Sequence, residues 1–256
     1  MTRTFLALSL LVLAGLMSAC SPGDAADGAK GAAEPPEKVI PKALAQRVPQ
    51  LPPVDEVRPS PVAGLYEVRF GGTEIIYTDA KGDFVLQGAL IDTRTMSNLT
   101  DARIEQLTAV AWDQLPLKDA MVFKQGDGSR RMAVFADPNC GYCKRFERDL
   151  VGLKDVTIYA FLLPILGPDS QAKSRDIWCA ADPSKAWRAW MIDGALPPKA
   201  AGASCDVAAL ERNLAFGRKH RINGTPALLF QDGSRKSGAL SVQRVEELLA
   251  AAARKP

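Results

Sequence analysis

Cys140 and Cys143 form the segment Cys-Gly-Tyr-Cys, and the other three cysteines of the chain form no second pair with this spacing. Two thiols this close support redox exchange, because the second thiol can attack a mixed disulfide formed at the first. A structural zinc site needs four ligands, and His220 is the one histidine, so metal binding is disfavoured. A purely structural disulfide across the pair remains an alternative, although that bridge is geometrically tight. We therefore expect redox chemistry without a metal or cofactor.

The cysteine pair lies where a strand is predicted to give way to a helix. Residues 131–136 form an apolar run too short for a helix, and a helix is predicted over 140–153. A helix N-terminus stabilises a thiolate, and thiols in such motifs have pKa values of roughly 3.5–7, against ~8.5 for a free cysteine. Cys140 is therefore the predicted nucleophile, open to disulfides of other chains, and Cys143 the predicted resolving thiol.

A second candidate element is Gly224-Thr225-Pro226, which leads into the apolar run 226–230. A proline at the first position of a strand is ordinary, because its missing N–H is harmless there. Beside a Cys-x-x-Cys unit, a cis-proline would instead leave the neighbouring backbone edge open for a substrate chain to pair as an added strand. We therefore expect Thr225 and Pro226 to bind substrate.

The elements around these residues predict an α/β domain over 118–256. Strands are predicted at 131–136, 156–163 and 226–230, with a further short strand after the turn Asp232-Gly233 and a C-terminal amphipathic helix. Between the second and third strands the patterns are mostly helical. This order is that of a thioredoxin fold carrying a helical insertion. His220 is expected in an exposed basic segment, and the tryptophans of the insertion are expected to pack: Trp178, Trp187 and Trp190.

The preceding segment, 39–98, predicts a small α+β domain. A short helix is expected at 39–48, interrupted near Pro41, and strands are expected at 66–70, 73–78 and 84–91. Thr100 is the expected N-cap of a helix over 101–114, which would serve as a linker, 99–117, to the next domain.

The start of the chain reads as an export signal. Residues 5–17 are apolar but shorter than the ~20 residues that span a membrane, so 1–19 is the predicted signal peptide. Small residues before Cys20 resemble a bacterial lipobox, which would make Cys20 a lipidation site; the alternative is ordinary cleavage nearby. Residues 20–38 have linker composition. The destination is an oxidising compartment, and a net charge of +3 is no sign of nucleic-acid binding.

Several motifs in order resemble the DsbC family of bacterial periplasmic disulfide isomerases: FADPNCGYCKRF, IWCAADPSKAW, SCDV and INGTPALLF. The stretch RPSPVAGLYEV resembles the dimerisation domain of that family. The resemblance implies a thioredoxin-like domain joined by a helical linker to a cystatin-like dimerisation domain. It makes Cys140 and Cys143 the catalytic pair and Pro226 the cis-proline, and it implies a structural disulfide between Cys179 and Cys205, which would otherwise be two buried free thiols.

The same resemblance implies a periplasmic, V-shaped homodimer that rearranges disulfides in misfolded exported proteins and is kept reduced by a DsbD-type membrane reductase. The DsbG subgroup, a reductase or chaperone with narrower substrates, shares this architecture. A DsbA-type dithiol oxidase is a further alternative, which the N-terminal sheet domain argues against, and a chaperone and a metal-delivery protein are others. Thioredoxin itself has a buried acid six residues before its first active cysteine, where this chain has Val134. The acceptor of the Cys143 proton is therefore not identified.

Overall fold

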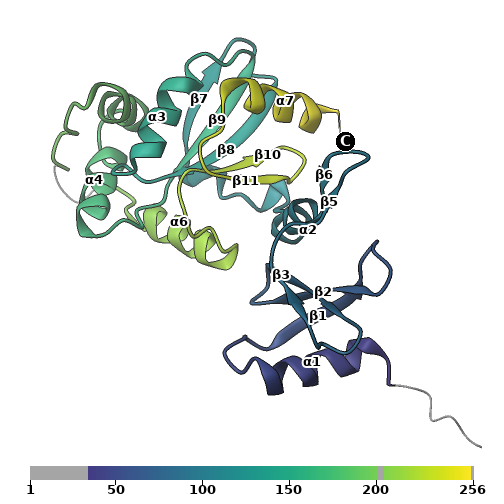
Figure 1. Ribbon diagram of the computed structural model, residues 1–256. Helices are drawn as coiled ribbons and strands as arrows, with labels where there is room; N and C mark the ends of the chain where they lie inside the picture. Colours follow the sequence, from purple (N-terminus) through teal and green to yellow (C-terminus); the bar gives the residue numbers. More distant parts are fainter. Residues whose placement is uncertain (1–33, 201–204, 255–256) are drawn as a thin grey trace, which may run out of the picture. The chain divides into compact units, whose positions relative to one another are not determined.

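The computed structural model describes residues 34–200 and 205–254, so the predicted signal peptide and Cys20 lie outside the described residues. The first element within the described residues is helix α1 (Pro36–Arg47), which packs on a four-stranded antiparallel sheet (Figure 1). Ile40 and Leu44 of α1 meet Val68 and Ile76 of the sheet in a small core. The strands follow the sheet in chain order: β1 (Val54–Pro59), β2 (Leu65–Phe70), β3 (Glu74–Asp79) and β4 (Val85–Leu86).

Three details of this domain correct the sequence prediction. Pro41 does not interrupt α1, which loses one hydrogen bond there but is held by the fully buried Ile40 and Leu44. Strand β1 occupies a Pro-rich stretch in which no strand was predicted, and Pro59 is tolerated because β1 is an edge strand. The strand predicted at 84–91 is broken, because Gly88 takes a φ of 153° that other residues rarely adopt. Its far end forms a separate ribbon, β5 (Ile91–Asp92) with β6 (Ser97–Asn98).

Helix α2 (Leu99–Thr108) also departs from the prediction. Its N-cap is Asn98, whose side chain accepts the N–H of Asp101 at 3.0 Å, and not Thr100. Thr100 lies inside the helix, buried, where its hydroxyl shares a 2.5 Å hydrogen bond with that of Tyr77. The helix ends at Thr108, and only a 3-10 turn, η1 (Trp112–Gln114), covers the rest of the range predicted to be helical.

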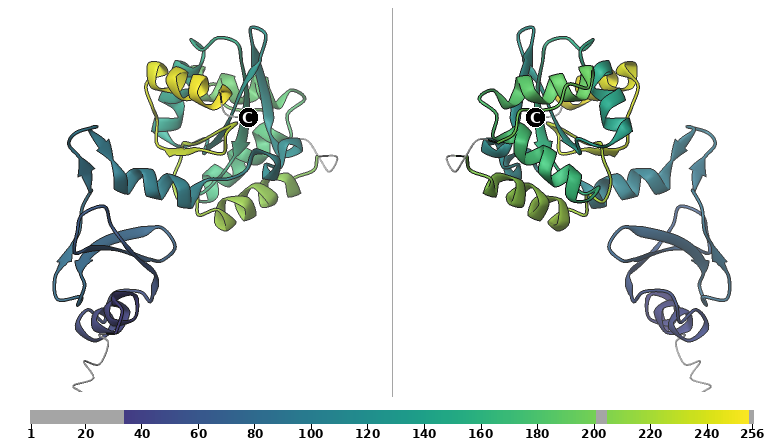
Figure 2. Two further views of the ribbon diagram at one scale, coloured as in Figure 1. Left: turned by 90° about the vertical axis from the view of Figure 1, so that its right-hand side faces the viewer. Right: turned by 90° about the vertical axis from the view of Figure 1, so that its left-hand side faces the viewer.

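The C-terminal part is a five-stranded sheet in the order β11-β10-β8-β9-β7 with helices on both faces (Figures 1 and 2). Strands β8 and β9 are parallel and the other neighbours antiparallel. The strands are β7 (Met121–Gln125), which was not predicted, β8 (Arg130–Ala136), β9 (Val156–Leu162), β10 (Ala227–Phe230) and β11 (Arg235–Ser237). The helices are α3 (Gly141–Leu150), α4 (Pro168–Trp178), α5 (Pro183–Arg188), α6 (Ala208–Lys219) and α7 (Val242–Ala253), with the short helices η2 (Leu117–Asp119) and η3 (Ala189–Asp193).

Alternate residues of β8 supply two separate cores, which explains why its sequence is continuously apolar from Met132 to Ala136. Met132 and Val134 point into a cluster with α3, α5 and α7, while Ala133 and Phe135 enter a second cluster on the opposite face, beside α6. The arrangement is the predicted thioredoxin-like fold with a helical insertion. None of the helices in the described ranges has both the length and the apolar character needed to cross a bilayer.

The tryptophans of the insertion pack as predicted, whereas His220 is less exposed than predicted. Trp187 is fully buried, and Trp178 and Trp190 pack against the same core. His220 is half-buried rather than exposed, because its ring lies against Phe216 with the ring centres 4.3 Å apart.

Candidate active site

Cys140 is the N-cap residue of α3, and its extended backbone aims the side chain back over the first turn. The N–H of Cys143 donates to Cys140 Sγ at 3.3 Å, so the sulfur takes the place that a capping oxygen usually occupies. The first N–H groups of a helix have no partner within the helix, and the helix dipole adds a partial positive charge. A thiolate at this position is therefore stabilised by the backbone itself.

The loop before β10 faces the cysteine pair. Cys140 Sγ lies 3.3 Å from the carbonyl oxygen of Thr225, to which the thiol donates, and the Thr225–Pro226 peptide bond is cis. The structure thus brings together all four residues that the sequence singled out for chemistry and substrate contact. They come from segments about 85 residues apart in the chain.

Cys140 is less open than the sequence analysis expects. Both cysteines are free thiols, and Cys140 is 6 % exposed against 2 % for Cys143. Its chain neighbours Gly141 and Tyr142 are exposed, so the sulfur lies just beneath the surface and not deep in the core. An incoming disulfide therefore has to replace the contact between Cys140 and the Thr225 carbonyl.

Cys143 lies one turn further into α3. Burial raises the pKa of its thiol, and the neighbouring Cys140 raises it further, while Thr225 and the backbone of Asp137 offset a smaller part. The two thiols are thus held in different environments, one at the helix end and one within the core. Such a separation suits a nucleophile and a resolving thiol.

Glu147 is a buried titratable residue on the helix of the cysteine pair that the sequence did not single out. It follows Cys143 by four residues on α3 and is buried on the same stripe as Phe146 and Leu150. Burial raises the pKa of Glu147, and Trp187 and Arg188 only partly offset this effect. The position of thioredoxin's acid is filled by the buried Val134 of β8, whereas Glu147 is a buried carboxyl on α3. A glutamate on an otherwise apolar helix stripe was the signal available in the sequence.

The helical insertion contains a disulfide between Cys179 and Cys205, with the Cα atoms 5.4 Å apart. Cys179 is the C-cap residue of α4 and Cys205 precedes α6, so the bond closes the segment that contains α5 and η3. In the part of the chain that the structure describes, no three His, Cys, Asp or Glu side chains are grouped to hold a metal ion.

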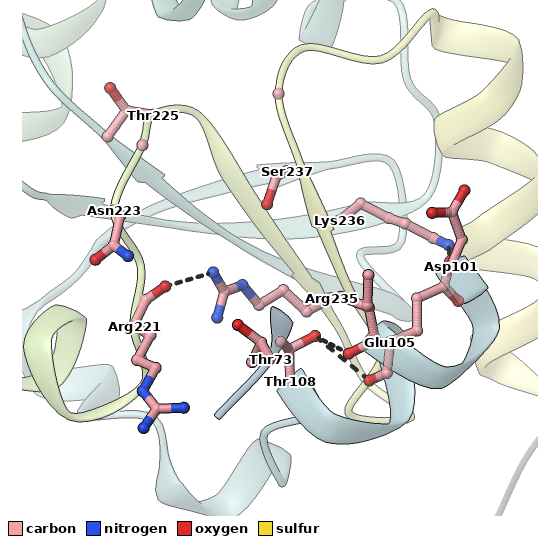
Figure 3. Close-up of a pocket in the computed structure, with 13 residues that line it drawn as sticks. Thr73, Asp101, Glu105, Thr108, Arg221, Asn223, Thr225, Arg235, Lys236 and Ser237 are labelled. Atoms are coloured by element: carbon pink, nitrogen blue, oxygen red, sulfur yellow. Dashed lines mark hydrogen bonds and ion pairs between the residues drawn. The ribbon is translucent and has the colours of Figure 1, made fainter. Parts of the chain in front are cut away.

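A cavity of about 740 Å³ lies beside Thr225 (Figure 3). Thr225 and Asn223 of the loop before β10 line one side, and β11 and α2 line the other. The lining is charged, with Lys236 of β11 paired to Glu105 of α2. Neither cysteine lines this cavity.

Comparison with known proteins matches two family descriptions in succession. Residues 31–101 match the "Disulfide bond isomerase protein N-terminal domain", and residues 117–253 match the "Thioredoxin-like domain". A Bordetella parapertussis protein named "Probable thiol:disulfide interchange protein DsbC" is 50% identical over 196 residues, which cover 77% of this chain and 68% of that protein. The chain belongs to the DsbC family.

Similarity to two further disulfide interchange proteins agrees with this assignment. The Escherichia coli thiol:disulfide interchange protein DsbC is 28% identical over 201 residues, 76% of this chain and 80% of its own length. A crystal structure of a disulfide interchange protein from Neisseria gonorrhoeae superposes with a TM-score of 0.50 at 36% identity, covering 54% of this chain and 98% of that one. As a member of the DsbC family, the protein is a thiol-disulfide oxidoreductase with a DsbC-type N-terminal domain and a thioredoxin-like domain.

Proposed function

We propose that Cys140 and Cys143 are the catalytic pair of a disulfide isomerase and reductase that acts on misfolded, disulfide-containing exported proteins. The observation that supports this most directly is the position of Cys140 Sγ, at the N-cap of α3 and within 3.3 Å of both the Cys143 N–H and the Thr225 carbonyl oxygen. A sulfur that caps a helix is stabilised as a thiolate, and the thiolate is the reactive form.

Isomerisation begins when the Cys140 thiolate attacks one sulfur of a wrong substrate disulfide. A new bond forms between Cys140 and that sulfur, the old disulfide breaks, and the second substrate sulfur leaves as a thiolate. This thiolate can attack another disulfide in the same substrate, and the last exchange returns Cys140 as a thiolate. No net oxidation or reduction occurs along this route.

Reduction uses the second thiol. Cys143 loses its proton and attacks the Cys140 side of the mixed disulfide, so that the substrate leaves with both of its sulfurs reduced and the enzyme keeps a Cys140–Cys143 disulfide. Two electrons have passed from the enzyme to the substrate. Because Cys143 is buried as a thiol, it resolves the mixed disulfide only once its proton has been removed.

The remaining proposals concern what surrounds this chemistry. Thr225 and Pro226 form the substrate-binding edge, where an extended substrate chain would pair beside Cys140. The N-terminal domain forms a homodimer. A DsbD-type membrane reductase returns the oxidised pair to the dithiol, which an oxidising periplasm would otherwise deplete. Cys20 is a lipidation site that would tether the protein to a membrane.

The test measures recovery of a scrambled, disulfide-containing enzyme together with the redox state of the pair. Cys140→Ser should abolish recovery, and Cys143→Ser should accumulate mixed disulfides that thiol reagents release. Alkylation trapping in cells should find Cys140 and Cys143 mostly reduced. Full recovery of activity with Cys140→Ser would overturn the catalytic proposal, and a mostly oxidised pair would point to an oxidase instead.

A further inference from the structure

The turn that leads into the nucleophile, Asp137-Pro138-Asn139, is held at each of its three residues by the helical insertion. The contacts come from α4 and from η3, a π-helical turn. These elements begin about 30 and 50 residues further along the chain, so the contacts are long-range. Since Cys140 follows this turn directly, whatever holds the turn also sets where the sulfur lies.

The first residue of the turn, Asp137, is buried and fixes the turn through hydrogen bonds. Its side chain is fully buried and accepts three hydrogen bonds: from the Asn139 N–H at 2.7 Å, the Ser170 hydroxyl at 2.7 Å and the Leu166 N–H at 3.0 Å. All three donors are uncharged. Burying a carboxylate costs free energy unless hydrogen bonds replace those it made to water. The loss of any one donor would therefore destabilise the buried Asp137, which keeps the three donors in fixed positions. Asp137 therefore joins the turn to α4 and to the loop before it.

The other two residues of the turn, Pro138 and Asn139, make hydrogen bonds to side chains of η3 and α4. The indole N–H of Trp190 donates to the carbonyl oxygen of Pro138 at 2.6 Å, and the side-chain amide of Asn139 donates to Asp169 at 2.6 Å. Two ammonium groups lie over the Trp190 ring, Lys144 at 3.8 Å and Lys173 at 5.1 Å from its centre. Lys173 is also paired with Asp169. The indole is thus fixed on its face as well as at its nitrogen.

We infer that Ser170 and Trp190 are positioning residues for the nucleophile, acting through Asp137 and Pro138, and that the helical insertion thereby sets the reactivity of Cys140. This inference rests on the proposed function of Cys140. The Cys140 N–H donates to the Asp137 carbonyl at 3.1 Å, so the turn passes directly into the cap of α3. The stabilisation of a thiolate by a helix end falls off within one turn, so a small displacement of the sulfur changes its reactivity.

Two substitutions each remove one hydrogen bond without changing a charge. Ser170→Ala removes a donor to Asp137, and Trp190→Phe removes the N–H to Pro138 but keeps an aromatic ring for the two lysines. Asp137→Asn is a poor probe, because losing a negative charge near the sulfur would itself favour the thiolate.

The structure supplies a matched control for each variant. Ser174 lies on the same helix as Ser170 and is equally buried, but its hydroxyl has no hydrogen-bond partner among the described residues. Trp112 packs on the opposite face of the sheet, and its indole N–H likewise has no partner in the described part of the chain. Ser174→Ala and Trp112→Phe therefore repeat the same chemical changes away from the turn. Val156→Ala, a buried deletion at the end of β9 that pairs with the start of β8, controls for lost stability.

The measured quantities are the alkylation rate of Cys140 as a function of pH in the reduced full-length protein and the equilibrium constant of its pair with glutathione. Ser170→Ala and Trp190→Phe should each slow alkylation at neutral pH by about threefold or more, move its midpoint to higher pH and shift the glutathione equilibrium. The three controls should stay near the parent protein. Equal profiles for the variants and their controls would overturn the inference, whereas failure of the proposed function would appear as isomerase activity that survives Cys140→Ser.

Discussion

Glu147 is a buried carboxyl one helical turn beyond Cys143, and its raised pKa has a consequence for stability. Below the pH at which an exposed glutamate ionises, the Glu147 carboxyl is protonated in both the folded and the unfolded protein. Its ionisation then makes no contribution to the free energy of unfolding. The unfolded chain releases the Glu147 proton at the ordinary pKa of a glutamate, whereas the folded protein keeps this proton up to its raised pKa. Between the two, deprotonation favours the unfolded chain. The free energy of unfolding must therefore fall as the pH rises through this range.

We expect Glu147→Gln to remove this pH dependence. As the pH rises above about 4.3, the ordinary pKa of an exposed glutamate, the unfolding free energy of the parent protein should fall more steeply than that of the variant. Urea unfolding followed by circular dichroism at several pH values measures both slopes. Glu211→Gln, at an exposed position of α6, is the control and should leave the slope unchanged. Parallel slopes for the parent protein and Glu147→Gln would contradict the prediction.

The raised pKa of the Cys143 thiol predicts unequal labelling of the two cysteines. In the reduced protein at neutral pH, iodoacetamide should modify Cys140 at least about tenfold faster than Cys143, because the alkylating reagent reacts with thiolates. Peptide mass spectrometry of a time course gives both rates. In urea the two rates should converge, since the helix end and the burial are then lost. Comparable rates in the folded protein would show that the two environments are not as different as the geometry implies.

At the scale of elements, the Cys179–Cys205 disulfide closes a segment with a sequence separation of 26. In the chain-entropy description, a loop of that length stabilises the folded protein by about 3.5 kcal/mol. Replacing both cysteines by alanine should lower the free energy of unfolding by about this amount, measured by denaturant titration without reductant in a background with Cys140→Ser and Cys143→Ser, which leaves no free thiol to exchange with the disulfide. A loss below about 1 kcal/mol would mean that the unfolded chain is already constrained in this region.

The contact between η2 and α6 depends on an ion pair. Asp119 is 2 % exposed, and Arg212 donates to both of its carboxylate oxygens, at 2.7 and 2.8 Å. Arg212 also contacts Asp206, next to the disulfide. Removing the arginine would leave Asp119 as a buried charge without this partner, which costs far more than the loss of a surface pair.

Arg212→Met should therefore lower the midpoint of urea unfolding by several times the effect of Arg244→Met. The control removes an arginine from an exposed pair with Glu247 on α7, and pairs of that kind contribute little. If the two variants had equal midpoints, the Asp119–Arg212 pair would have no special structural role.

How much of the fold could be predicted from sequence depended on how each element is buried. Strands β8 and β9 are covered on both faces, so their apolar runs were plain. Strand β7 escaped notice because it is a short edge strand in which only Met121 and Phe123 are buried, while Val122 and Lys124 face outward. The cysteine pair and the proline were found because their chemistry is local in sequence. The contacts of Ser170 and Trp190 with the turn were not predicted. Their partners lie 33 and 52 positions away, and no local pattern in the sequence indicates contacts over such separations.

At the scale of the whole molecule, the proposed homodimer requires a surface in the N-terminal domain. Strand β4 is an edge of the four-stranded sheet, and it exposes apolar side chains together with the residue before it: Phe84 is 77 %, Val85 47 % and Leu86 52 % exposed. An exposed edge strand has unpaired N–H and C=O groups that pair readily with another chain, and apolar side chains there favour association. We therefore expect the proposed homodimer to pair through this edge.

We expect Leu86→Asp to convert the proposed dimer into a monomer, because a charge would then lie between the paired strands. Val122→Asp is the matched control: Val122 is 48 % exposed on β7, an edge strand of the five-stranded sheet, and the proposed dimer should survive its substitution. Sedimentation equilibrium gives the two masses. The monomer should still reduce a small soluble disulfide, since Cys140 and Cys143 are untouched, but it should lose recovery of a scrambled protein, which has to be held while its disulfides exchange. A Leu86→Asp protein that remains dimeric would place the interface elsewhere, and a monomer that isomerises as well as the parent would separate dimerisation from function.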